Sequence, residues 1–252
     1  MSMSFKAVVV LAILLSLGSV ADAAEIRVLS GGGLRSVLQE LFPQFEPASG
    51  HTVINKFGIS AQLGKAISEG EQCDVAILND PLPEQLAKQG QLVPGTLTEI
   101  ARVGIGVAIR SGAGKPDIST VDAFKSALLA AKSLSYAEQS QSGQYFAKLI
   151  ERLGIAEAIN SKATLMPGGA VAVVGPVARG EVEIAVSVIS DILATEGVEL
   201  LGPFPPELQT YVVFTAGRST SSKQPDAART LINFLSSPEA ASTIKAKGVE
   251  AR

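Results

Sequence analysis

The chain has 252 residues, of which 46% are hydrophobic and 18% charged, and its formal net charge is −3. This length and composition predict one large or two small globular domains and exclude a disordered chain. A mild negative charge without long basic runs argues against nucleic acid as a partner.

The first residues have the pattern of an export signal. Lys6 precedes the apolar run "AVVVLAILLSLGSVADAA", which ends in the small-x-small sequence Ala21-Asp22-Ala23. The run is shorter than the roughly 20 apolar residues that a membrane span needs. We therefore predict a signal peptide over residues 1–23, cleavage near Ala23, and a soluble, monomeric mature chain outside the cytoplasm.

Short apolar strands then alternate with amphipathic helices. Strands are predicted at 25–30, 51–57 and 73–78, and helices at 33–48, through Leu63 and Ile67, and at 81–90. This alternation predicts an α/β fold with a mainly parallel sheet that is covered by helices.

A Gly-spaced strand within 101–115 separates this series from a second one. The second series has predicted helices at 119–131, 142–153 and 169–180, and predicted strands at 133–137, 163–167, 183–188, 198–204 and 210–216, before a last helix at 225–235. We predict two lobes, the first formed by 24–104 and 192–252 and the second by 105–191. The strands near 103–109 and 184–189 are the predicted connections. A ligand is expected in the cleft between the lobes, which can close about a hinge.

The only cysteine is Cys73 and the only histidine is His51. The single cysteine excludes an internal disulfide and a zinc cluster. The single histidine excludes a Ser-His-Asp triad that does not include His51. Cys73 lies in a predicted buried strand, where a core role is expected. His51 is expected at the start of a strand.

Four loops at predicted strand exits have the composition of anion-binding sites. They are Ser30-Gly31-Gly32-Gly33, residues 58–62, "EQSQSGQY" (138–145) and Pro167-Gly168-Gly169. Each can direct backbone N–H groups of a helix N-terminus at an anion, although such residues also serve as ordinary helix caps. The candidate ligand-binding residues in and beside these loops are Ser30, Gly32, Gly33, Arg35, Ser60, Ser140, Ser142, Gly143, Tyr145 and Gly169.

Two of the remaining side-chain assignments stay open between two roles. Arg35 is either a solvated charge or a fork that binds a carboxylate, and Tyr145 either covers a ligand or packs inside. Asp80, Glu138 and Asp191 lie near strand ends, where exposure or capping is expected. Nucleotide binding is excluded, because no phosphate-loop motif occurs and the dinucleotide pattern fails at Ser36.

The chain resembles the extracytoplasmic solute-binding proteins of ABC transporters, in their molybdate-binding-like branch. The stretches that carry the resemblance are "FGISAQLGKAISEGEQCDVAILND", "SGQYFAKLIERLGI", "AVSVISDIL" and "LINFLSSPEAASTI". The resemblance implies a two-lobed periplasmic-binding-protein fold with a hinge, a periplasmic location and an oxyanion in the cleft. It also implies a possible partner, an ABC permease, and assigns ligand contacts to Ser60, to Ser142 and to the amides near Ala170.

Two positions depart from the pattern of this branch. Gly33 stands where a serine is expected, and Val188 stands where a tyrosine is expected, so two hydroxyl donors are missing. These departures favour an organic di- or tricarboxylate over molybdate, and no metal or cofactor is expected. Molybdate or tungstate binding remains an alternative.

A second alternative is enzymatic. Periplasmic aconitate isomerases resemble the same fold, and their proton shift needs a positioned base and carboxylate clamps. The sequence offers Glu138, Tyr145 or a serine-bound water for the base.

Overall fold

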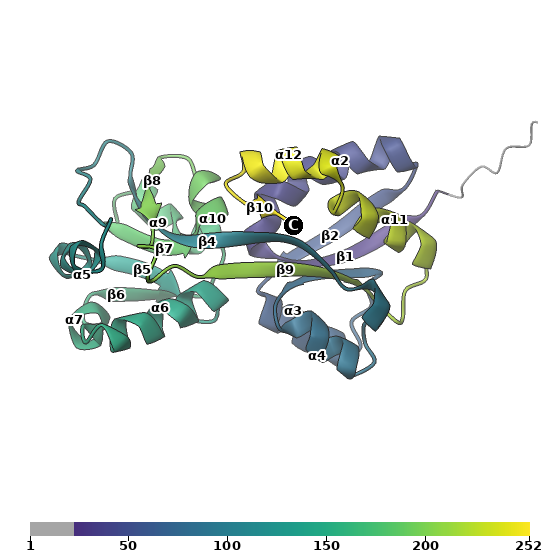
Figure 1. Ribbon diagram of the computed structural model, residues 1–252, viewed down its shortest axis with the longest axis horizontal. Coiled ribbons are helices and arrows are strands. Elements are labelled where there is room, and N and C mark those ends of the chain that lie inside the picture. The colour runs from purple at the N-terminus through teal and green to yellow at the C-terminus, as the bar shows by residue number, and fades with distance from the viewer. Residues whose placement is uncertain (1–22) are drawn as a thin grey trace, which may run out of the picture.

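The computed structural model describes residues 23–252, which form two lobes joined by long strands (Figure 1). Residues 1–22 of the predicted signal peptide lie outside the described residues, which begin at its last residue, Ala23. A sheet runs through both lobes in the strand order β2-β1-β3-β9-β4-β7-β5-β6, with β8 and β10 paired to β4. The prediction of a two-lobed α/β fold is confirmed.

The first lobe has a parallel sheet with helices on both faces. Its strands are β1 (Glu25–Gly31), β2 (Thr52–Gly58) and β3 (Val75–Asn79), with the short β10 (Glu250–Ala251) at β4. One face carries α2 (Arg35–Ser49), α11 (Pro225–Leu235) and α12 (Pro238–Ala246), and the other carries α3 (Ser60–Ser68) and α4 (Leu82–Lys88). Two 3-10 turns complete the lobe, η1 (Gly32–Leu34) and η2 (Pro94–Thr96).

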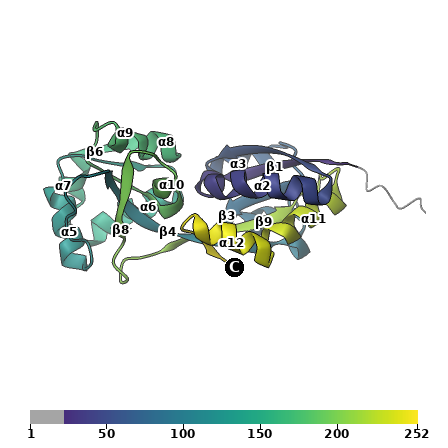
Figure 2. The same ribbon diagram turned by 90° about the horizontal axis from the view of Figure 1, so that it is seen from above.

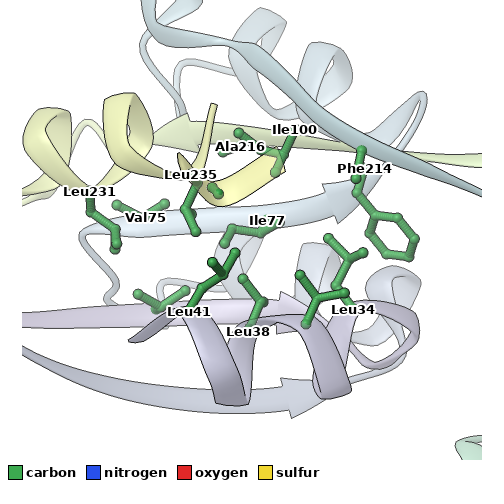
Figure 3. Close-up of a cluster of buried hydrophobic side chains, with 14 of the residues drawn as sticks. Leu34, Leu38, Leu41, Val75, Ile77, Ile100, Phe214, Ala216, Leu231 and Leu235 are labelled. Carbon is green, nitrogen blue, oxygen red and sulfur yellow. The ribbon is translucent and has the colours of Figure 1, made fainter. Parts of the chain in front are cut away.

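The core of the first lobe lies between its sheet and α2. Figure 3 shows side chains of α2, β3, β9 and α11 packed together, with Phe214 at one end of the cluster beside Leu34. The apolar positions recur every three or four residues from the N-cap of α2 onward, which places Leu34, Leu38 and Leu41 on one buried face. Cys73 lies in the smaller cluster under α3 and α4 and is 2% exposed, so its predicted core position is confirmed.

The second lobe repeats this arrangement. Its strands are β5 (Leu134–Ala137), β6 (Ala163–Met166), β7 (Ile184–Val188) and β8 (Val198–Pro203), of which the first three run parallel. Its helices are α5 (Val121–Ala130), α6 (Gln141–Arg152), α7 (Ala156–Asn160), α8 (Ala170–Val173), α9 (Gly175–Ala178) and α10 (Ile189–Leu193).

Two long strands carry the chain between the lobes. The first half of β4 (Thr98–Arg110) pairs antiparallel with β9 (Tyr211–Arg218), and its second half pairs antiparallel with β7 and β8. Where the two segments cross, the Gln209 side chain accepts from the Ile105 N–H at 3.1 Å and donates to the Ile105 carbonyl at 3.0 Å. This pair of bonds ties the returning segment to β4.

These connections correct three predictions. The sheet is mixed rather than mainly parallel, because β4 and β9 cross between the lobes in opposite directions. The predicted connection at 184–189 is wrong, because β7 lies inside the second lobe, between β4 and β5. The boundary after 191 comes too early, because β8 pairs with the second half of β4 and both Phe204 and Leu208 pack in the core of the second lobe.

The predicted helix at 169–180 is also interrupted. The chain forms α8 and α9 with a break at Val174, and Pro176 lies in the first turn of α9. Proline has no N–H for the helical hydrogen bond and its ring crowds the preceding turn, which disfavours a continuous helix through this position.

Candidate ligand-binding site

A cavity of about 940 Å³ lies between the two lobes, and its lining comes from both (Figure 2 shows the lobes on either side). The first lobe contributes the segments that follow β1, β2 and β3, together with Phe214 of β9. The second contributes the segments that follow β5, β6 and β7. These are the carboxyl ends of parallel strands, where α/β sheets bind their ligands. We call this cavity the cleft.

The first predicted loop is held close to two apolar side chains. A Cβ atom on Gly31 would lie 2.7 Å from Phe214 Cε1, and one on Gly33 would lie 3.0 Å from Phe214 Cζ and 3.3 Å from Val188 Cγ2. Only glycine allows this approach without a shift of the neighbours. We call Gly33, Val188 and Phe214 the cleft floor.

The second predicted loop places Ser60 in the cleft at the first residue of α3. Its hydroxyl accepts a hydrogen bond from the Asn79 N–H at 3.2 Å. The Ser60 proton is therefore left free to donate, since that bond uses only an acceptor site of the hydroxyl. The amides at the start of α3 add the positive end of the helix dipole.

The third predicted loop contains two serines that line the cleft, and one of them also caps a helix. Ser140 caps α6, because its hydroxyl accepts from the Gly143 N–H at 3.0 Å and lies 3.1 Å from the Ala137 carbonyl. The Ser142 hydroxyl lies 3.1 Å from that of Ser140. Both serines line the cleft, whereas Gly143 does not.

The fourth predicted loop reaches across to the first lobe. Gly168 and Gly169 have φ angles of +116° and +85°, a conformation that favours glycine. A Cβ atom on Gly168 would lie 2.7 Å from Cδ1 of Ile59, and Ile59 is the residue before α3. Gly169 lines the cleft, and the predicted amides near Ala170 begin α8.

Arg35 supplies the positive charge of the cleft. It is the first residue of α2, and its guanidinium carbon lies 4.2 Å from the centroid of the Phe57 ring. Stacking on an aromatic face holds the planar group while its N–H edge stays available for an anion. Arg35 is exposed and lines the cleft, and its role as a fork that binds a carboxylate stays a prediction.

Two carboxyl groups also line the cleft, and the sequence had assigned both to exposure or capping. Burial raises the pKa of Asp191 to about 7, while a hydrogen bond from Ser187 and the positive charge of Arg35 act in the opposite direction. The Ser187 hydroxyl lies 3.4 Å from Asp191 Oδ2. Burial also raises the pKa of Asp80, whose Oδ1 accepts from Thr215 Oγ1 at 2.8 Å. Among the described residues, these two acids and Arg35 are the ionisable side chains of the cleft.

Hydrogen bonds between side-chain amides join the two lobes at the cleft. Asn79 Nδ2 donates to Gln141 Oε1 at 2.6 Å, and Gln62 Nε2 donates to Gln139 Oε1 at 2.8 Å. Gln141 Nε2 also lies 3.3 Å from the carbonyl oxygen of Asp80. The lobes are thus in contact with each other across the cleft.

Two other predicted residues point elsewhere. The Ser30 hydroxyl donates to Asn55 Oδ1 at 2.9 Å, and the Tyr145 hydroxyl donates to the Leu208 carbonyl at 2.7 Å, so neither lines the cleft. Tyr145 packs against the core of the second lobe. The alternation of side chains along β1 could have found this, because Ser30 follows Ile26 and Val28 at every second position and shares their buried face.

The sequence matches a described family over nearly all of the residues that the structure describes. The profile for bacterial extracellular solute-binding proteins covers residues 26–250. The chain belongs to this family. The resemblance to its molybdate-binding-like branch is confirmed by a curated relative, the molybdate-binding protein ModA of Azotobacter vinelandii. The two are 29% identical over 243 residues, which is 92% of each protein.

Two further comparisons place this solute-binding protein. The aconitate isomerase of a Pseudomonas species is 30% identical over 231 residues, or 89% of this chain and 87% of that protein. The solved structure of the Azotobacter vinelandii periplasmic molybdate-binding protein aligns with a TM-score of 0.76 at 19% identity. The alignment covers 90% of this chain and 99% of that one, which shows a shared fold. Within residues 23–252 no helix is long and apolar enough to cross a membrane.

Proposed function

We propose that the cleft of this solute-binding protein holds a small organic di- or tricarboxylate. The observation that carries the proposal is Arg35, which lines the cleft on the ring of Phe57. A planar guanidinium donates two parallel hydrogen bonds to a carboxylate, and its fixed positive charge attracts a ligand with several carboxylates. The amides and hydroxyls of the loops around Ser60 and Ser142 would hold the remaining carboxylates.

The size and polarity of the cleft support an organic ligand. A volume of about 940 Å³ lies in the range of roughly 300–1,000 Å³ that is typical of pockets for small organic molecules. The cleft floor presents the apolar side chains of Val188 and Phe214 beside Gly33. These groups can contact a carbon skeleton, but they offer no hydrogen bond to a metal oxyanion.

Isothermal titration calorimetry with citrate, both aconitate isomers, molybdate and tungstate tests the proposal. We expect saturable binding of a polycarboxylate, at least tenfold weaker binding by Arg35→Ala, and unchanged binding by the control Arg229→Ala. Arg229 is a suitable control because its side chain is 70% exposed on α11. Tight binding of molybdate alone would sink the proposal.

Delivery of the ligand to an ABC permease is the role that we propose for the binding protein in its cell. The exported chain would work in the periplasm. Its structural neighbour from Azotobacter vinelandii is named as a periplasmic protein, which supports this location. Uptake of labelled ligand by cells with and without the gene tests this role. Unchanged uptake in the deletion strain would contradict it.

A second candidate function is isomerisation of the ligand in the same cleft. The observation that favours it is the similarity to the Pseudomonas aconitate isomerase over 89% of this chain. The interconversion of trans- and cis-aconitate is a proton shift, for which the ionisable side chains of the cleft are available. Incubation of the purified protein with trans-aconitate, followed by detection of the cis isomer, separates an isomerase from a protein that only binds.

A further inference from the structure

Asp191 is placed in the cleft by a tight junction between strand and helix. β7 ends at Val188, and α10 begins at the next residue, so Asp191 follows the last strand residue by three positions. The junction is fixed to the first lobe, since the buried Ser190 hydroxyl donates to the Gly33 carbonyl at 2.6 Å. The Asp191 carboxyl group therefore has a defined position beside the cleft floor.

The carboxyl group of Asp191 is available for chemistry. In the described chain its one hydrogen bond from a side chain comes from Ser187, at the long distance of 3.4 Å. Asp80, the other acid of the cleft, is held by the 2.8 Å bond from Thr215, and its N–H donates to the Val213 carbonyl at 3.0 Å. The two acids thus differ, because Asp80 is built into the contact with β9, while Asp191 faces the cavity.

We propose that Asp191 is the catalytic residue of the cleft, the base that moves a proton along an unsaturated polycarboxylate. The proposal rests on the polycarboxylate site and on isomerisation, its second candidate function. Asp191 would take a proton from the methylene carbon, and the electron pair of that C–H bond would form a new C=C bond to the middle carbon. The pair of the old C=C bond would move to the far carbon, which takes the proton back from Asp191. Atoms, charge and oxidation state balance without a further reactant.

The surroundings of Asp191 suit both halves of this step. With a pKa of about 7, the group is ionised enough to accept a proton at neutral pH and acidic enough to return it. Two groups act on it directly: the Ser187 hydroxyl of β7 lies 3.4 Å from its Oδ2, and Arg35 of α2 contributes a positive charge. Asp80 lines the same cleft. The guanidinium of Arg35 would also stabilise the negative charge that spreads into the substrate carboxylates during the shift.

The test uses the mature protein with trans-aconitate in deuterium oxide, followed by proton NMR, together with calorimetry of binding. Asp191→Asn is expected to bind trans-aconitate within tenfold of the wild type. Its rates of isomerisation and of deuterium incorporation should fall by about a hundredfold or more, as is typical when a general base is lost. Asp191→Glu should recover part of the rate with a displaced pH profile. Asp122→Asn, an exposed substitution in α5 of the same lobe, should match the wild type.

The possible failures can be told apart. Wild-type rates in Asp191→Asn, or loss of binding by that variant, would overturn the catalytic assignment. A wild-type protein that binds polycarboxylates without isomerising trans-aconitate would also overturn it, while the binding proposal would stand. A wild-type protein that binds no polycarboxylate would overturn both.

Discussion

Gly33 and Val188 meet on the cleft floor, where a Cβ atom on Gly33 would lie 3.3 Å from Val188 Cγ2. They are the two positions at which the sequence departs from the pattern of the molybdate-binding-like branch. The structure places these two positions in one contact, which Phe214 completes. The departures therefore form a single apolar change in the cleft rather than two independent losses.

This contact predicts the result of restoring a hydroxyl. Gly33→Ser should lower the free energy of unfolding by roughly 1–3 kcal/mol, because the new Cβ would lie 3.0 Å from Phe214 Cζ in a packed region. Urea denaturation measures the change. Gly95→Ala is the control, since no atom lies within 4 Å of its added Cβ. Equal stability of the two variants would show that the cleft floor is loosely packed.

Ionisation of Asp191 should make stability depend on pH. Its pKa is about 7 in the folded protein against 3.8 for an ordinary aspartate, so the folded state holds the proton more tightly. The free energy of unfolding should then fall as pH rises from about 4 to about 7. One pKa unit corresponds to about 1.4 kcal/mol. We therefore expect the difference in free energy of unfolding between Asp191→Asn and the wild type to shift in favour of the variant by up to about 4 kcal/mol from pH 4 to pH 8. Parallel pH profiles of the two proteins would contradict this expectation.

The hydrogen bonds between side-chain amides across the cleft should favour contact between the lobes. Gln141→Ala removes the bonds to the Asn79 side chain and to the Asp80 carbonyl. Each bond is worth about 0.5–1.5 kcal/mol, so we expect a larger radius of gyration by X-ray scattering and ligand affinity about tenfold lower. The exposed Gln39→Ala on α2 is the control. If Gln141→Ala scattered like the wild type with and without ligand, these bonds would have no part in closure.

The thiol of Cys73 should be unreactive in the folded protein. Burial raises its pKa to about 12, and the side chain is 2% exposed. Because the thiolate is the reacting form, alkylation at pH 8 should be negligible until the chain unfolds, and then rapid. Mass spectrometry after timed addition of iodoacetamide, with and without urea, measures this. Equal rates under both conditions would mean that the core under α3 opens readily.

The sequence predicted local elements better than it predicted the connections between them. The apolar spacing of Leu34, Leu38 and Leu41 and the glycines after β1 mark α2 and its loop clearly. The crossing of β4 and β9 leaves no such local signal, because antiparallel and parallel strands of a buried sheet have similar apolar runs. The lobe boundary was misplaced for the same reason.

Within the site, the sequence located the loops but not the roles of individual side chains. Ser60, Ser142 and Arg35 line the cleft, as the sequence predicted. Ser30 and Tyr145 instead donate hydrogen bonds to groups outside it. Asp191 was placed near a strand end, yet its pKa depends on its burial in the folded chain and on Arg35, which lies more than 150 residues away in the sequence. Such a contact is visible only in the folded chain.

The central claim is that the cleft accepts an organic polycarboxylate through Arg35. Its most direct test is calorimetric titration of the wild type and of Arg35→Ala with trans-aconitate, citrate and molybdate under one set of conditions. We predict saturable binding of at least one polycarboxylate by the wild type, a loss of at least tenfold in Arg35→Ala, and no saturable binding of molybdate. Tight molybdate binding that survives Arg35→Ala, with no response to either polycarboxylate, would contradict the claim.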